Sequence, residues 1–240
     1  MASLKDKRIV VLGGTSGLGF ATAQAAGAEG AQLVVASGRQ ARVDRAVSLL
    51  PAGTTGHVCD FTDEAQIKDL FGHIGAFDHL VYTAGDGLLL GDFTSTSIAD
   101  AKRAYDVRVW GAMTAVKYGA PLIREGGSIV LTTGIASQRP FKGWVVPSSL
   151  LSAMEGMARA LAVELAPIRV NIVSPGVVRT EMWGSMPEDA REALFADVGS
   201  KLLTGKVGEA AEIAETYLYL MKQTYSTGQM VTVDGGGVLV

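Results

Sequence analysis

Short runs of apolar, mostly β-branched residues alternate along the chain with longer stretches in which apolar positions recur every three or four residues. The short runs are continuous rather than alternately polar, which is typical of strands that helices cover on both faces. This pattern predicts strands over Arg8–Leu12, Gln32–Ala36, Gly56–Cys59, His79–Tyr82, Ser128–Leu131, Arg169–Val173 and Gln229–Val233.

The longer stretches predict the helices that connect these strands. They cover Leu18–Glu29, Gln40–Leu50, Asp63–His73, Ser97–Pro121, Ser148–Ala166 and Glu209–Met221. Regular alternation of strand and helix indicates a parallel sheet with right-handed crossovers. We therefore expect one α/β domain over residues 1–240, in which a doubly wound, seven-stranded parallel sheet lies between two layers of helices.

Residues 179–208 interrupt the alternation. The segment contains Met182, Trp183, Met186 and Phe195 and few β-branched residues. Long connections in compact domains often carry function. Two interpretations stay open: a helical flap over a substrate cleft, or an ordinary pair of surface helices.

Composition narrows the class of protein. Of 240 residues, 48% are hydrophobic and 19% are charged, which argues against a disordered chain. The net charge is −3 and the basic residues are scattered, so no electrostatic footprint for nucleic acid or an anionic membrane is present. We expect a small-molecule substrate instead. The single cysteine, Cys59, excludes an intrachain disulfide.

Targeting and metal binding are not expected. The apolar run Ile9–Leu12 is too short for a signal sequence or a membrane span, and glycines end it. We therefore expect a cytoplasmic protein. His57, His73 and His79 lack metal-ligand spacing with a nearby carboxylate, so no metal site is expected.

A glycine-rich turn follows the first predicted strand and opens the first predicted helix. Its sequence is Leu12-Gly13-Gly14-Thr15-Ser16-Gly17-Leu18-Gly19. Gly13 permits a sharp turn, Gly17 allows the backbone to approach a pyrophosphate, and Gly19 allows the helix to pack closely on the strand. The helix N-terminus supplies N–H groups and partial positive charge for the phosphates. The turn predicts a dinucleotide site, and a turn without a ligand is the alternative.

The spacing Gly-xxx-Gly-x-Gly resembles the short-chain dehydrogenase/reductase family, and the resemblance continues over the full length. Its further motifs are Asp60-Phe61, Tyr82-Thr83-Ala84-Gly85, Pro175-Gly176-Val177-Val178-Arg179-Thr180 and Val233-Asp234-Gly235-Gly236. The resemblance implies a Rossmann-type fold, an acidic residue at the adenine, and a Pro-Gly-xxx-Thr loop at the nicotinamide amide. The cofactor-binding residues expected on this basis are Gly13, Thr15, Ser16, Gly17, Leu18, Gly19, Ser37, Arg39, Asp60, Phe61, Ala84, Gly85, Pro175, Gly176, Val178 and Thr180.

The end of the second strand indicates which dinucleotide binds. An acidic residue there would favour NAD through the ribose 2′-hydroxyl. The strand ends instead in Ala36-Ser37-Gly38-Arg39. Ser37 and Arg39 suit a 2′-phosphate, with Arg42 less well placed, so we expect NADP, with NADPH favoured over NADH. A solvated Arg39 is the alternative.

The resemblance also implies a catalytic Asn, Ser, Tyr and Lys, with Tyr and Lys spaced as Tyr-xxx-Lys on one helix. No such spacing occurs in the chain. When the family pattern is aligned on neighbouring segments, Arg108 stands at the Asn position and Gly134 at the Ser position. Pro147 stands at the Tyr position and Leu151 at the Lys position. Since neither of these two side chains can exchange a proton, the usual alcohol–ketone mechanism does not carry over.

Arg108 is the strongest candidate for a replacement, whereas Ser148, Ser149, Thr133 and Lys142, which lie near the vacated positions, are expected to be caps and loop contacts. A buried arginine near the nicotinamide can bind a carboxylate or stabilise a developing oxyanion. An ion pair with Asp106 or another acid is the alternative. Tyr82 is expected in the core rather than at the cofactor ribose. Trp144 and Trp183 suit either an apolar pocket or a packing role.

Three functions remain open from the sequence. The first is an NADP-dependent reductase of unusual mechanism that acts on an activated acceptor such as an iminium, quinone or conjugated enone. The second is a dinucleotide-binding protein without turnover, and the third is a redox-neutral cyclase or isomerase. By resemblance, a homo-oligomer (tetramer or dimer) is expected to form through the helices over Ser97–Pro121 and Ser148–Ala166.

Overall fold

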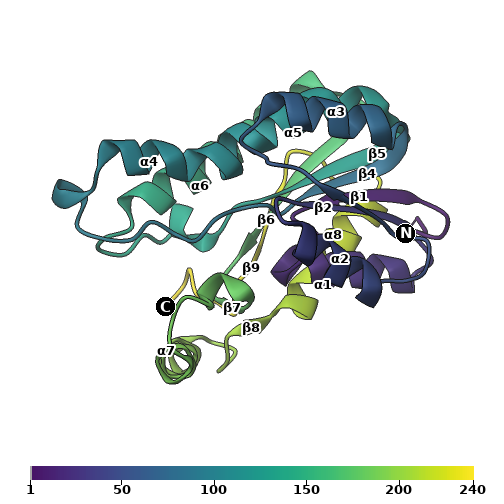
Figure 1. Ribbon diagram of the computed structural model, residues 1–240. Helices are drawn as coiled ribbons and strands as arrows, with labels where there is room; N and C mark the ends of the chain where they lie inside the picture. Colours follow the sequence, from purple (N-terminus) through teal and green to yellow (C-terminus); the bar gives the residue numbers. More distant parts are fainter. Residues whose placement is uncertain (1) are drawn as a thin grey trace.

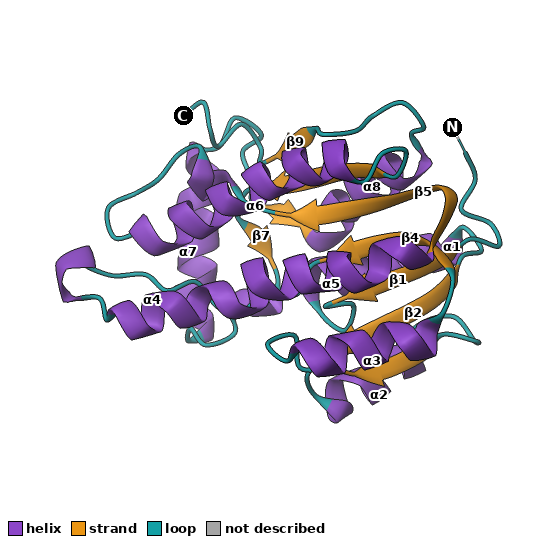
Figure 2. Cartoon of the chain, turned by 90° about the horizontal axis from the view of Figure 1, so that it is seen from above, coloured by secondary structure: helices purple, strands orange, loops and turns teal. Residues whose placement is uncertain are grey.

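The computed structural model describes residues 2–240 and contains one seven-stranded sheet in which every neighbouring pair is parallel. The strand order is β3-β2-β1-β4-β5-β6-β9. Figure 2 shows β2, β1, β4 and β5 side by side in this order. The prediction of a doubly wound seven-stranded sheet is therefore confirmed. The strands are β1 (Arg8–Leu12), β2 (Gln32–Ser37), β3 (Thr55–Val58), β4 (Phe77–Tyr82), β5 (Ile123–Thr132), β6 (Arg169–Pro175) and β9 (Met230–Val233).

Helices cover both faces of the sheet, which confirms the three-layer arrangement (Figures 1 and 2). Along β1, Val10 and Leu12 face one core, while Ile9 and Val11 face the other. This alternation explains why the strands are apolar at successive positions. The first core lies under α3 (Glu64–Ile74), α5 (Ala112–Gly119) and α6 (Val145–Glu164), and the second under α1 (Gly17–Ala28), α2 (Gln40–Leu49) and α8 (Ala210–Lys222).

The strand order places a crevice at the carboxyl ends of β1 and β4. The chain winds outward from β1 through β2 to β3, and then returns to the other side of β1 at β4. Loops that follow adjacent strands on opposite sides of such a switch point diverge and leave room for a ligand. The glycine-rich turn after β1 and the loop after β4 therefore border the same opening.

The long helix predicted over Ser97–Pro121 is interrupted. It consists of α4 (Ile98–Tyr105), a π-helical segment over Asp106–Gly111, and α5. The buried Tyr82 hydroxyl donates a hydrogen bond to the backbone oxygen of Val107, at 2.5 Å. This tertiary contact engages a helical carbonyl from outside, and it has no signature in helical periodicity. Such π-helical segments often occur at functional sites.

The helix predicted to begin at Ser148 begins three residues earlier, at Val145. Pro147 therefore lies within the first helical turn. Proline is tolerated there, because N–H groups of the first turn have no partner within the helix. In the sequence, Pro147 suggests that the helix begins after it, whereas in the structure the helix already includes it.

Residues 179–208 form an excursion from the main fold, and its two ends are paired with each other at its base. After β7 (Val178–Arg179) come a 3₁₀ turn (Glu181–Trp183) and α7 (Glu188–Lys201), and the chain returns at β8 (Gly208–Glu209). β7 and β8 pair in parallel, with Val178 opposite Gly208. These two-residue strands are too short for the sequence pattern to reveal. Within residues 2–240, no helix has both the length and the apolarity that a membrane crossing needs.

Candidate active site

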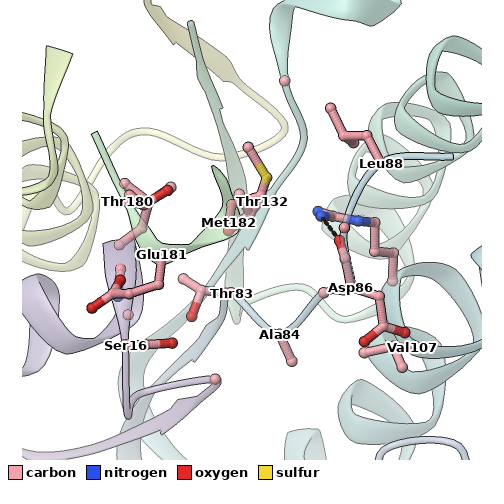
Figure 3. Close-up of a pocket in the computed structure, with 18 of the residues that line it drawn as sticks. Ser16, Thr83, Ala84, Asp86, Leu88, Val107, Thr132, Thr180, Glu181 and Met182 are labelled. Atoms are coloured by element: carbon pink, nitrogen blue, oxygen red, sulfur yellow. Dashed lines mark hydrogen bonds between the residues drawn. The ribbon is translucent and has the colours of Figure 1, made fainter. Parts of the chain in front are cut away.

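A cleft of about 620 Å³ opens at the carboxyl ends of the central strands. Every residue that the sequence predicted as cofactor-binding lines this cleft, from Gly13 in the first turn to Thr180 after β7. Figure 3 shows the middle of the cleft, where Ser16, Thr83 and Ala84 face Thr180 and Glu181. Loops after β1, β2, β3, β4 and β6 thus contribute to one site.

The glycine-rich turn packs against its neighbours too tightly for side chains. Gly13 has φ +86°, and a Cβ atom there would lie 2.5 Å from the backbone nitrogen of Ala84. A Cβ atom on Gly19 would lie 2.3 Å from both the Gly13 oxygen and the Thr83 hydroxyl oxygen. The turn, the start of α1 and the loop after β4 are therefore held in close contact by backbone atoms.

The N-terminus of α1 already holds an anion. The N–H group of Gly17 donates to a carboxylate oxygen of Glu181 at 2.9 Å. The N-cap residue Ser16 is extended and makes no capping bond with its side chain. This is the position where the turn is expected to bind pyrophosphate, so the backbone there suits a phosphate group. Sequence reasoning missed Glu181, whose only signal was its place directly after Thr180.

Two arginines and one acidic residue line the part of the cleft that lies beyond β2 and β3. Ser37, Arg39 and Arg42 line the wall beyond β2, and Asp60 follows β3. Within the described chain, neither Arg39 nor Arg42 forms an ion pair. The Asp60 carboxylate accepts hydrogen bonds from the Thr62 N–H group at 2.9 Å and from the Thr62 hydroxyl at 2.8 Å. The guanidinium groups can therefore meet a phosphate, and Asp60 is oriented by its own loop.

Arg108 faces the cleft from the π-helical segment. Its guanidinium lies against Gly85 and donates to the backbone oxygen of Asp86. Burial lowers the pKa of Arg108, and the nearby Asp86 partly offsets that shift. The ion pair with Asp106 that the sequence left open does not form among the described residues. The cleft thus contains a half-buried cation whose hydrogen bond is to a neutral carbonyl.

Around Arg108 the walls are mostly apolar and aromatic. Gly134 and Leu151 line the cleft, whereas Pro147 is buried in α6 and does not belong to the lining. Among residues 2–240, the lining includes neither a tyrosine nor a lysine. The other lining residues of this end are Leu88, Val107, Ile135, Ala136, Phe141, Trp144, Met182 and Trp183.

The polar side chains nearest to this end are already engaged. The Tyr82 hydroxyl is in the core, as expected, and burial raises its pKa. The Thr133 hydroxyl donates to the backbone oxygen of Leu151 at 2.9 Å, and the Tyr105 hydroxyl donates to Ser149 at 2.8 Å. None of these groups is placed as a proton donor at the cleft.

Other titratable groups have structural partners. His79 is buried, its Nδ1 atom lies 2.9 Å from the Ser128 hydroxyl, and burial lowers its pKa to about 4. Burial also raises the pKa of Cys59 to about 12, which keeps the thiol protonated. No cluster of three His, Cys, Asp or Glu residues that could hold a metal occurs among residues 2–240.

Comparison with known proteins identifies the family. The SDR-like Rossmann domain matches residues 2–240. The chain is 35% identical over 257 residues to the short-chain dehydrogenase/reductase ATR9 of Stachybotrys chlorohalonatus, with 100% of both proteins covered. The protein therefore has a Rossmann-type fold of the dehydrogenase/reductase class. It belongs to the short-chain dehydrogenase/reductase family.

Two solved structures are also similar. One is a small-chain dehydrogenase in complex with NADPH, with 37% identity, a TM-score of 0.84, and coverage of 98% of this chain and 100% of that chain. The other is the MalC reductase/Diels-Alderase from Malbranchea aurantiaca, with 28% identity, a TM-score of 0.92, and coverage of 99% and 98%. The expectation of an NADP-dependent oxidoreductase agrees with these relatives.

Proposed function

We propose that the protein is an NADPH-dependent reductase that transfers hydride to a small, largely apolar acceptor whose reacting carbon is already activated. An iminium, a quinone or a conjugated enone would meet this description. One observation carries the proposal: every residue expected to contact a dinucleotide lines the cleft, yet the lining within residues 2–240 has no tyrosine or lysine.

The residues present fit a dinucleotide phosphate and a 2′-phosphate. The Gly17 N–H group already binds a carboxylate, and Arg39 and Arg42 line the cleft beyond β2 without ion-pair partners in the described chain. Guanidinium groups match the geometry of phosphate oxygens well. The solved NADPH complex of a relative with 37% identity supports the same choice of cofactor.

Arg108 would orient the acceptor. When bound, the nicotinamide supplies a hydride. Arg108 can donate hydrogen bonds to a carbonyl or carboxylate oxygen of the acceptor, and it can stabilise negative charge that develops there. Leu151, Trp144 and Phe141 would form apolar walls beside the reacting carbon. An iminium becomes a neutral amine on receiving hydride and needs no proton, whereas an enone would take its proton from solvent.

We call the part of the cleft around Arg108, where the acceptor would bind, the acceptor end. Residues 179–208 would act as a flap over it. The excursion is closed at its base by β7 and β8, and its Met182 and Trp183 line the cleft. A segment attached in this way can move without disturbing the sheet. We propose that its position controls access to the acceptor end.

A redox-neutral ring closure in the same pocket is the second candidate. It is favoured by the similarity to MalC, which is named both a reductase and a Diels-Alderase. Arg108 would then polarise a carbonyl of the substrate, and the apolar walls would hold two reacting segments close together. Such a reaction would form product without consuming NADPH.

We also propose a homo-oligomer that forms through α5 and α6. An apolar groove between these helices is lined by Met113, Val116, Lys117, Ala120, Pro121, Leu161, Leu165 and Ile168. Trp110, Met113 and Val163 are exposed nearby, and Val163 has 82% of its surface accessible. Light scattering after size exclusion would test this, and a monomer at micromolar concentration would contradict it.

NADPH titration followed by an acceptor panel tests the main proposal. We expect micromolar or tighter NADPH binding, and NADPH oxidation with cyclic imines, quinones or enones but not with simple ketones. Tight binding without oxidation of NADPH by any acceptor would indicate a binding protein or the redox-neutral activity. Reduction of simple ketones at comparable rates would contradict the assignment, because it would require a proton donor at the acceptor end.

A further inference from the structure

We propose that Glu181 is an internal occupant of the phosphate position in the dinucleotide cleft, and that it thereby sets the affinity for NADPH and the position of the flap. This inference rests on the proposed cofactor site. It adds an affinity-determining residue that does not belong to the glycine-rich turn itself.

The contact is made to the part of α1 that attracts anions most strongly. Gly17 is the first residue of this 12-residue helix, and its N–H group donates to Glu181 at 2.9 Å. A carboxylate at a helix N-terminus gains both a charge-assisted hydrogen bond and a favourable interaction with the helix dipole. Figure 3 shows the Glu181 side chain directed toward Ser16 at this turn.

A pyrophosphate and this carboxylate cannot share the position. A Cβ atom on Gly17 would lie 3.4 Å from the Thr180 Cβ atom and 3.6 Å from the Glu181 carboxylate. The segment after β7 therefore rests directly on the turn, at van der Waals distance. A phosphate that bound the Gly17 N–H group would meet a like charge at close range, so Glu181 must leave before the cofactor can bind.

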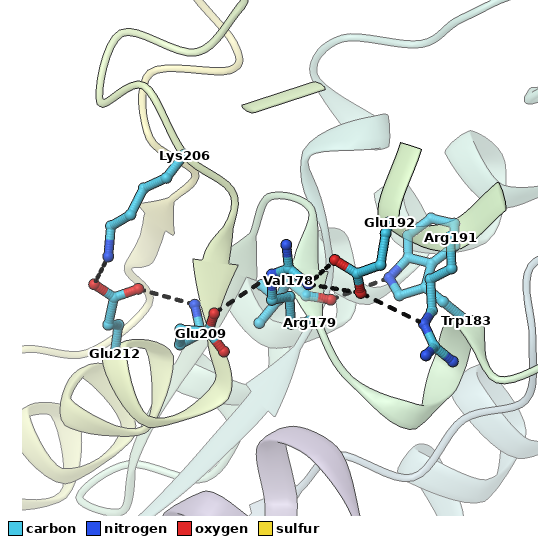
Figure 4. A network of polar contacts seen from close by, with 8 residues as sticks. All are labelled: Val178, Arg179, Trp183, Arg191, Glu192, Lys206, Glu209 and Glu212. Carbon is cyan, nitrogen blue, oxygen red and sulfur yellow. Dashed lines mark hydrogen bonds and ion pairs between the residues drawn. The ribbon is translucent and has the colours of Figure 1, made fainter. Parts of the chain in front are cut away.

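Departure of Glu181 would move the acceptor wall. Its neighbours Met182 and Trp183 line the cleft in the same 3₁₀ turn. Arg179 pairs with Glu192 of α7 at 2.7 Å and with Glu209 at 3.6 Å, so these contacts tie α7 to the base of the segment (Figure 4). Movement is therefore confined to the part of the flap between Arg179 and α7, and the indole N–H group of Trp183, which donates to the backbone oxygen of Val178 at 3.0 Å, limits its extent. Occupation of the phosphate position is thereby transmitted to the acceptor end, and the dinucleotide would bind before the acceptor.

The first test measures NADPH affinity of Glu181→Gln. The amide retains the shape and a hydrogen-bond acceptor but removes the charge. Since charge-assisted hydrogen bonds are roughly twice as strong as neutral ones, we expect the Kd for NADPH to fall about five- to tenfold. Glu188→Gln is the matched control: it makes the same charge change in the same excursion, on an exposed residue of α7. Its Kd should match that of the unchanged protein.

The second test separates phosphate occupation from nicotinamide contacts. 2′-Phospho-ADP-ribose carries the phosphates but lacks the nicotinamide. Its binding should increase hydrogen exchange of the amides at 182–186, and Glu181→Ala should show the increase without any ligand. Glu181→Ala also serves as the second variant if the glutamine variant folds poorly.

The outcomes distinguish the two proposals. If NADPH binds the unchanged protein, but Glu181→Gln leaves the Kd the same or weakens it, the role of Glu181 is wrong and the cofactor site stands. Unaltered exchange at 182–186 on saturation with 2′-phospho-ADP-ribose would also overturn it. If the unchanged protein binds neither nucleotide at micromolar concentration, both proposals fall together.

Discussion

One end of the cleft is formed mainly by backbone atoms, and the other mainly by side chains. At the end formed by the glycine-rich turn, which we call the phosphate end, backbone atoms form the surface. Gly13 and Gly19 have no room for a Cβ atom, and the Gly17 N–H group binds a carboxylate. At the acceptor end, side chains form the surface, with Arg108 among apolar and aromatic walls. Where the backbone itself forms a site, its geometry restricts which residue types fit. Where side chains form a site, they can be replaced while the fold persists.

The largest expected effect falls on the phosphate end. Gly19→Ala would push a methyl group to 2.3 Å from the Gly13 oxygen, so the turn must shift. Because a misplacement of about 1 Å can reduce function about 100-fold, we expect NADPH binding to weaken by about that factor or more. Titration with NADPH measures it. Gly72→Ala is the control, since a Cβ atom there meets nothing within 4 Å. Equal affinities of the two variants would contradict the tight-turn argument.

Arg108→Gln should affect the acceptor end alone. Removing an oriented cation that stabilises developing charge typically lowers turnover by about 100-fold. We expect that loss in kcat/KM for an enone, with less than about a threefold change in NADPH Kd. Stopped-flow binding and steady-state turnover separate the two quantities. A parallel loss of NADPH affinity would show that the two ends are not independent.

Acid should destabilise the sheet body that both ends share. Burial lowers the pKa of His79 to about 4, from its usual 6.5, so the folded protein keeps the imidazole neutral. As pH falls below 6.5 the unfolded chain takes up a proton that the folded chain does not, and stability is lost until about pH 4. The loss at pH 5 is about 2 kcal/mol.

Urea unfolding between pH 7 and pH 4 measures this loss. His79→Asn can keep a hydrogen bond to Ser128 and should flatten the profile over that range. His73→Asn, on the exposed side of α3, should change the profile less than His79→Asn does. Identical profiles for the His79 variant and the unchanged protein would contradict the assignment.

The smallest expected effect discriminates between the two dinucleotides. Arg39→Ala should weaken NADPH binding about tenfold, a typical cost of losing one charge-assisted contact, and leave NADH binding nearly unchanged. Arg42→Ala is the matched control, and we expect it to have a smaller effect because Arg39 lies closer to the end of β2. Equal losses for NADPH and NADH would exclude recognition of a 2′-phosphate by Arg39.

Several features of the site were predictable and others were not. The glycine spacing predicted a tight turn between β1 and α1, and all the residues that the resemblance assigns to the cofactor line one cleft. The π-helical segment has no signature in the periodicity, and Tyr82, which donates a hydrogen bond to Val107 within it, lies 25 positions away. Glu181 meets Gly17 across 164 positions, and no local pattern connects them.

The order of strands and helices, the two buried faces of the sheet and the glycine turn follow from the chain's own pattern. Periodicity and backbone geometry are local properties, so residues near one another are enough to specify them. The direction of Arg108, the closed base at β7 and β8, and the carboxylate on α1 depend on residues far apart. Packing alone brings those residues together, because their contacts form only after the layers have assembled.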